Sequence, residues 1–159
     1  MSFIRTVLVL LAALAGTAFL TPANAQVAAN GVVRVPSAYG VDETVTRLKA
    51  DVAAKGIMFF QEVNQSKLAA EAGIKVLPST LLVFGNPPLG TQFIAARPEA
   101  GLDWPVRLLV QQDDKGDVWA VYTDFGWIAR RHGVSGESAK PFETAAGVIA
   151  SITSAVKGN

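Results

Sequence analysis

The sequence predicts an α+β fold in which helices cover one face of a mainly antiparallel sheet. Three observations lead to this prediction. Strand-like and helical stretches are mixed along the first half of the chain, a clear β-hairpin follows, and the chain closes with an amphipathic helix. The 159 residues are enough for one domain with a hydrophobic core, and no internal repeat indicates a second domain.

The first elements are predicted to be a strand, a helix and a second strand. Residues 32–35 are rich in valine and predict a strand that ends at Pro36. Asp42 is placed to cap a helix whose apolar residues recur at helical spacing until Gly56. Ile57–Val63 then reads as a strand of mixed burial, because apolar residues occupy both of its faces.

A short helix and a buried strand are expected next. Asn64 is predicted to cap the helix, with Leu68 and Ala72 on its inner face and Gly73 at its end. The apolar run Leu81–Phe84 is bounded by turn residues, which is typical of a buried strand.

A short helix over Leu89–Ala96 precedes the hairpin, which is the clearest element of the chain. Val106–Gln111 and Val118–Thr123 alternate apolar and polar residues, and the turn-forming run Asp113–Asp117 joins them. Although this turn is acidic, it lacks the later bidentate glutamate of a calcium loop.

The chain ends in two predicted helices. Asp124 is placed to cap the first, which reaches Arg131. Pro141 suits the first turn of the second. Five apolar residues of this last helix share one face: Phe142, Ala145, Ile149, Ile152 and Val156.

The first 25 residues have the features of a secretory signal peptide. Arg5 is followed by an apolar run from Val7 to Leu20 and by the small-residue sequence Ala23–Ala25. The run is shorter than the roughly 20 residues of a membrane-spanning helix. We therefore expect cleavage after Ala25 and export to the periplasm, which leaves a mature protein without a transmembrane segment.

Charge and composition exclude several classes of function. Without the signal segment the chain has 13 basic and 13 acidic residues and no basic run, so we expect no nucleic-acid binding. The chain has no cysteine and one histidine, so disulfides and the usual zinc sites are excluded. No dinucleotide or phosphate-loop pattern is present, and the sequence identifies no cofactor.

His132 is the only candidate for nucleophile activation or proton transfer by an imidazole. It follows Arg130 and Arg131 at the end of a predicted helix, where cations complement the negative helix end. One interpretation is a helix-terminal charge cluster, and the other is an acid or base that uses Asp103 or Asp124 as its partner.

The candidate binding site is a rigid corner after the buried strand. Phe84 leads into Gly85, Asn86 and Pro87, and Thr91 follows shortly. Glycine allows unusual backbone angles, and proline restricts the residue before it, so polar groups are held at the strand end.

Asp103 and Tyr122 are added to this candidate site, since a ligand pocket needs polar groups beside an apolar wall. Tyr122 lies in the half of the chain that also holds Trp104, Trp119 and Trp127. These aromatic residues could fill a core, line a pocket or form a dimer surface.

The same residues resemble the signature of the bacterial domain-of-unknown-function 302 family over Ser37–Val134. The matching features are Pro78, Phe84–Pro87, Gly90–Thr91, Pro98, Leu102–Asp103, Pro105 and Arg131–Gly133. This resemblance implies a TATA-binding-protein-like fold with a curved antiparallel sheet, often dimeric, and no settled activity. Members often carry Asp-His where this chain has Asn64–Gln65, and glutamine cannot titrate near neutrality or bind a metal as histidine can.

These observations divide the chain into four segments and lead to three hypotheses. The segments are the signal peptide (1–25), a lead-in with the first strand (26–36), the family core (37–134), and a linker with the C-terminal helix (135–159). The leading hypothesis is a non-enzymatic module that binds a small ligand or a protein partner at the corner. The alternatives are a homodimer whose seam contains Trp119 or Trp127, and an enzyme that uses His132.

Overall fold

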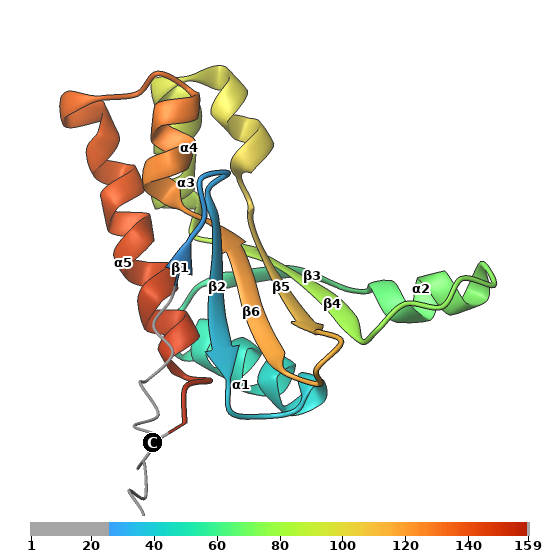
Figure 1. The fold of residues 1–159 in the computed structure, drawn as a ribbon. Helices are drawn as coiled ribbons and strands as arrows, with labels where there is room; N and C mark the ends of the chain where they lie inside the picture. The colour runs from blue at the N-terminus through green and yellow to red at the C-terminus, as the bar shows by residue number, and fades with distance from the viewer. Residues whose placement is uncertain (1–25, 159) are drawn as a thin grey trace, which may run out of the picture.

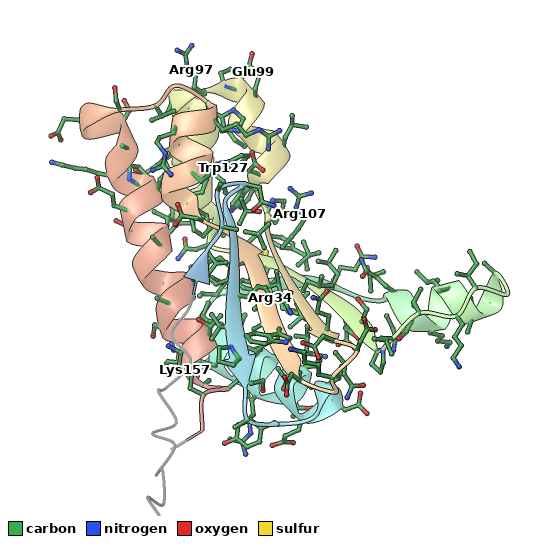
Figure 2. The ribbon with its side chains drawn as sticks, in the orientation of Figure 1. Arg34, Arg97, Glu99, Arg107, Trp127 and Lys157 are labelled. Atoms are coloured by element: carbon green, nitrogen blue, oxygen red, sulfur yellow. The ribbon has the colours of Figure 1, made fainter. Side chains whose placement is uncertain are left out.

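The computed structural model describes residues 26–158, which form one antiparallel sheet with helices (Figure 1). The expected signal peptide lies outside the described residues, so export remains a prediction. Six strands lie in the order β1-β2-β6-β5-β4-β3, and every neighbouring pair is antiparallel. Their bounds are β1 Gln26–Val27, β2 Val32–Ser37, β3 Met58–Asn64, β4 Ser79–Gly85, β5 Val106–Gln112 and β6 Val118–Thr123.

The helices lie against one face and one end of this sheet, apart from α2, which projects from it (Figure 1). They are α1 Val41–Ala54, α2 Gln65–Glu71, α3 Pro87–Ala96, α4 Phe125–Arg131 and α5 Lys140–Ser154, with 3₁₀ turns η1 Pro98–Asp103 and η2 Gly136–Ala139. The α+β class predicted from the sequence is therefore confirmed. None of the helices within residues 26–158 combines the length and hydropathy needed to cross a membrane.

The core lies between one face of the sheet and the helices. Alternate strand residues point into it, because successive side chains of a strand face opposite sides. The buried hydrophobic strand residues are Val33, Val35, Leu82, Phe84, Leu108, Val110, Val118 and Ala120. Helix α1 adds Leu48 and Val52, and α5 adds four of the five residues predicted for its inner face. The fifth, Val156, is buried but lies just beyond the end of the helix.

Several predicted boundaries are confirmed and others shift. The hairpin pairs Gln112 with Val118, and Asp124 caps α4 by accepting from the amide of Trp127 at 2.7 Å. Helix α1 begins beyond Gly40 rather than at an Asp42 cap, and strand β2 runs through Pro36 to Ser37. Proline is allowed within β2 because it lacks only the backbone N–H donor. A strand tolerates that loss at a position where the N–H would have no partner.

Residues 65–78, called the arm from here on, project from the body beyond β3 and β4 (Figure 1). Local interactions hold the arm in shape. Asn64 accepts from the amide of Lys67 at 2.8 Å, as predicted, and Gly73 ends the helix with φ of 72°. The predicted inner face of α2 is wrong, because this helix buries none of its residues and Leu68 is exposed.

Strand β3 also differs from the prediction of mixed burial. Six of its seven residues are exposed, and only Val63 is half-buried. β3 is the last strand of the sheet, so nothing within residues 26–158 pairs with its outer edge. The apolar residues that suggested burial therefore lie on an open edge.

Candidate functional site

The corner after β4 is built around the indole ring of Trp104. A Cβ atom at Gly85 would lie 2.9 Å from Nε1 of Trp104, and one at Gly90 would overlap the same ring. Phe84, immediately before Gly85, is buried in the core. Both glycines are therefore required by close packing, and neither has a positive φ that would demand glycine.

The polar residues of the corner serve the start of α3. The side chain of Asn86 accepts from the amide of Leu89 at 3.3 Å, which makes it the N-cap, and Pro87 occupies the first turn. Thr91 donates to the carbonyl oxygen of Pro87 at 2.7 Å. Because both side chains remain exposed, a ligand could still reach them, but their hydrogen bonds are explained by the helix start.

Two hollows adjoin this corner. One is a small apolar cavity of about 30 Å³ beside Trp104 and Phe93, which is the size of one water rather than of an organic ligand. The other is an open groove of about 400 Å³ between the corner and α5. It is lined by Lys55, Ile57, Asn86, Leu89, Thr144, Gly147, Val148 and Ser151. The groove has the volume of small-molecule sites.

Asp103 and His132 form a buried pair next to this corner, since Asp103 directly precedes Trp104 and the cavities at the two places share Val106 and Phe125. His132 Nε2 lies 2.7 Å from Asp103 Oδ2, and their side chains are 8% and 4% exposed. Arg131 Nη1 lies 3.3 Å from each carboxylate oxygen, and Arg107 Nη2 lies 3.5 Å from Oδ1. A carboxylate only accepts, so Nε2 of His132 carries a proton.

The geometry of this pair shows which of the two aspartates considered, Asp103 or Asp124, is the partner of His132. Asp103 is the bonded partner, whereas Asp124 caps α4 and lies 3.9 Å from Arg130. His132 ends α4, yet its ring binds a carboxylate from η1 instead of capping the helix. The pair therefore fastens η1 to α4.

Tyr122 lies near Asp103 but has no hydrogen bond to it within the described chain. Both residues line a cavity of about 20 Å³ together with Thr123 and Phe125. Burial, and then the negative charge of Asp124, raise the pKa of the Tyr122 hydroxyl. The hydroxyl is therefore held neutral at any physiological pH.

The chemistry that this cluster supports is limited by access. A histidine–carboxylate pair can move protons, but this pair is buried and its cavity is smaller than a substrate. Residues 26–158 contain no group of three or more histidine or acidic side chains arranged to hold a metal ion.

The predicted site residues therefore separate into two groups. Phe84 through Thr91 lie around Trp104, and Asp103 and Tyr122 lie around the small cavity beside His132. The two indoles considered for a dimer seam are both half-buried within the chain. Trp119 donates to Asp113 at 2.8 Å, and Trp127 packs against Gly31.

The largest exposed apolar surface lies outside the predicted site. Among residues 28–158, seven of the nine exposed large hydrophobic residues fall between positions 58 and 77. Three of them, Met58, Phe59 and Phe60, form what we call the base patch on β3. The other four, Leu68, Ile74, Val76 and Leu77, form the tip patch on the arm.

The sequence carries a signal for this surface, although the same signal also predicts a buried strand. Met58–Phe60 are consecutive apolar residues, which suggested burial on both faces of a strand. Val76 and Leu77 stand in a loop, where apolar residues have no packing reason within the chain. By contrast, no sequence signal links Trp104 to Gly85 and Gly90, because that contact depends on the tertiary structure.

Comparison with curated proteins gives relatives from Brucella. The chain is 36% identical over 131 residues to proteins named fluoride-specific ion channel FluC 1 in Brucella suis and Brucella abortus, and FluC 2 in Brucella melitensis. The alignment covers 80% of this chain but 52% of the B. suis protein and 48% of the other two. The chain thus spans about half the length of these relatives.

A solved structure and a family model agree with the fold. The crystal structure of the uncharacterized conserved protein DUF302 from Bacillus stearothermophilus superposes with a TM-score of 0.72 at 16% identity, covering 79% of this chain and 98% of that one. The family model described as domain of unknown function DUF302 matches residues 33–154, which include α5. This chain therefore belongs to the DUF302 family.

Proposed function

We propose that this chain is an exported, non-catalytic module that binds a protein partner through its arm and β3. The single observation that carries this proposal is the concentration of exposed apolar residues in the base and tip patches. A monomeric protein rarely exposes a large connected apolar surface unless that surface has a function. Helix α2 buries nothing in its own chain, so a partner would supply the packing that it lacks.

The internal order of the arm supports this interpretation. Its helix is capped by Asn64, closed after Gly73 and tied to β4, where Ser79 donates to Gln65 at 2.8 Å. A segment held in one conformation presents its side chains at little entropic cost on binding. Gln65, which replaces the histidine common in the family, is thus part of the arm's attachment.

The relatives support a module that works beside a further protein region. In the Brucella proteins a region like this chain makes up about half of a longer protein that is named as an ion channel. The predicted signal peptide supports export, and the channel activity is not carried over.

Site-specific photo-crosslinking in the expressing bacterium tests this proposal. A photoreactive residue at Ile74, which is 60% exposed in the tip patch, should give a covalent adduct with a partner chain. The matched control is Leu102, which is 69% exposed on η1 and lies outside both patches. The proposal fails if Ile74 gives no adduct or if both positions give the same adducts.

A second candidate function is small-molecule binding in the groove beside Asn86. Its support is the groove's volume of about 400 Å³ and its apolar floor, which includes Ile57, Leu89 and Val148. Native mass spectrometry of the purified chain should then show an added mass that disappears on denaturation. Val148→Trp would fill the groove and should abolish the added mass, and a bare wild-type chain would exclude this candidate under the conditions of purification.

An enzymatic role for His132 is supported only by its hydrogen bond to Asp103. A proton-transfer role predicts that His132 titrates in the presence of substrate and that an opening forms above it. If NMR shows that the imidazole N–H protons of His132 do not exchange with solvent, the pair has the structural role of holding η1 to α4.

A further inference from the structure

A polar groove lies between α1 and the two strands that carry the arm, and we call it the α1 groove. Its volume is about 300 Å³, within the range of small-molecule sites. It is lined by Asp42, Val45, Thr46, Lys49, Glu62, Asn64 and Thr80. None of these residues lines the groove beside Asn86, so the two grooves are separate.

Helical spacing and strand register together produce this lining. The α1 residues of the groove stand at positions 42, 45, 46 and 49, a spacing that places them on one face of the helix. In the sheet, Asn64 is paired with Thr80, and Glu62 is paired with Leu82. Because paired residues lie on the same face of a sheet, Glu62 and Asn64 share the helix-covered face with the buried Leu82. The α1 groove is therefore formed where α1 meets the exposed strand β3.

The floor of the α1 groove contains a hydroxyl group without a partner. Thr80 is only 5% exposed, and its side chain forms no hydrogen bond within the described part of the chain. No buried polar side-chain atom in that part is both sealed from solvent and unbonded, so the hydroxyl is reached through the groove. A hydroxyl at this depth has lost most of its water contacts, which lowers stability unless an occupant supplies a hydrogen bond.

The walls of the α1 groove carry one negative charge in excess. The Lys49 ammonium is matched by the Glu62 carboxylate at 2.7 Å, which leaves the carboxylate of Asp42. Asp42 forms no ion pair in the described chain, and α1 begins after Gly40 without a side-chain cap. A free carboxylate favours a cationic group on the ligand, because charge-assisted hydrogen bonds are stronger than neutral ones.

Asn64 supplies a hydrogen-bond donor opposite Thr80. Its amide oxygen accepts from the backbone amide of Lys67 at 2.8 Å and from the hydroxyl of Ser66 at 2.9 Å. Its amide nitrogen donates to no group within residues 28–158, so this nitrogen is available to an acceptor on a ligand. The α1 groove thus combines a carboxylate, a free amide donor and a free hydroxyl.

We propose that the α1 groove binds a small ammonium compound that also carries a hydroxyl or carbonyl oxygen, the chemistry of amino alcohols. The ammonium group donates to Asp42, and the ligand oxygen accepts from the Asn64 amide and bonds the Thr80 hydroxyl. Val45, which is 8% exposed, supplies an apolar surface for the carbon chain. This site goes beyond the proposed function, because it requires neither apolar patch and no protein partner.

Titration of the purified protein with ethanolamine, followed by proton–nitrogen correlation NMR, tests the proposal. The backbone amides of Thr46, Asn64 and Thr80 should shift and then saturate. Ethylene glycol, which has a hydroxyl in place of the ammonium group, should cause no saturable shift at the same concentrations. Asp42→Asn should weaken ethanolamine binding by about tenfold or more, the effect of losing one hydrogen bond to a charged group. Asp114→Asn makes the same change of charge in the hairpin turn, outside the groove, and should leave binding unchanged.

Thr80→Val separates a binding role of the hydroxyl from a structural one. Since the hydroxyl has no hydrogen bond to lose within the described chain, the variant should unfold at the same temperature as the wild type or a higher one, and should bind ethanolamine more weakly. A variant that unfolds at a lower temperature and binds ethanolamine normally would assign the hydroxyl to the fold and overturn the inference. The absence of saturable shifts with ethanolamine, equal shifts with ethylene glycol, or equal affinities of Asp42→Asn and Asp114→Asn would also overturn it.

Discussion

Helices α5 and α2 both have apolar residues at helical spacing, but α5 lies packed in the core and α2 lies exposed. Helix α5 buries Phe142, Ala145, Ile149 and Ile152 in the core, whereas α2 buries no residue at all. Both helices were predicted to have an apolar inner face. The comparison shows that helical periodicity predicts which residues need a partner surface, and not whether that surface lies in the same chain.

The first prediction contrasts these two helices by removing one apolar side chain from each. Phe142 stacks on Phe93 with ring centroids 4.1 Å apart, so Phe142→Ala should lower the free energy of unfolding by roughly 3–5 kcal/mol. Leu68→Ala on α2 should change it by less than about 0.5 kcal/mol in dilute protein. Urea unfolding of both variants at low concentration measures the difference, and equal losses would contradict the division between body and arm.

The second prediction concerns the buried clamp of the body. Asp103→Ala leaves His132 and Arg131 without their acceptor, which should cost roughly 3 kcal/mol of unfolding free energy. Asp114→Ala, in the exposed hairpin turn, is the control and should be nearly neutral. A stable Asp103→Ala variant would show that the pair is not structural and would revive a catalytic role for His132.

A third pair of variants tests the corner with two helical glycines. Gly90→Ala places a methyl group inside the Trp104 indole and should cost about 1–3 kcal/mol through repacking. Gly147→Ala on α5 meets no atom within 4 Å and should stabilise the chain by up to about 1 kcal/mol. The midpoint temperature of thermal unfolding should therefore fall for Gly90→Ala and rise for Gly147→Ala. A rise for both variants would mean that Trp104 can move away from the added methyl group.

The smallest effect is a pH dependence confined to the hairpin. The indole of Trp119 donates to Asp113 and, with two backbone amides and Arg34, holds the pKa of that carboxyl below its ordinary value. Stability from a lowered carboxyl pKa is present above about pH 4 and is lost as the pH falls through the folded value. Trp119 fluorescence should therefore change in acid, and Asp113→Asn should remove most of that change.

The alkaline counterpart involves Tyr122. Its raised pKa contributes stability below about pH 10 that is lost as the pH rises, because the unfolded chain releases that proton first. Tyr122→Phe should reduce this alkaline loss of stability. An unchanged loss in the variant would mean that other groups cause it. Neither Asp113 nor Tyr122 lies in the arm, so neither change of pH should alter the arm.

Local patterns were sufficient to predict much of the fold. The hairpin, the caps at Asn64 and Asp124, and the buried face of α5 all follow from short-range rules. The bonded pair Asp103–His132 was one of two alternatives, since residues 29 positions apart cannot be paired from spacing alone.

What the sequence did not predict depends on contacts made in three dimensions. Trp104 explains Gly85 and Gly90, but only the folded corner brings these residues together. Leu68 was assigned to a core because its spacing is helical, and the open position of the arm is a property of the whole sheet. The candidate binding surface was missed for the same reason.

Amide hydrogen exchange of the purified chain tests the central claim, that α5 completes its packing within the chain whereas the arm and β3 do not. In dilute protein, amides of α5 should exchange slowly and those of the arm and the β3 edge quickly. Exchange in the arm and the β3 edge that is as slow as in α5 would contradict the claim.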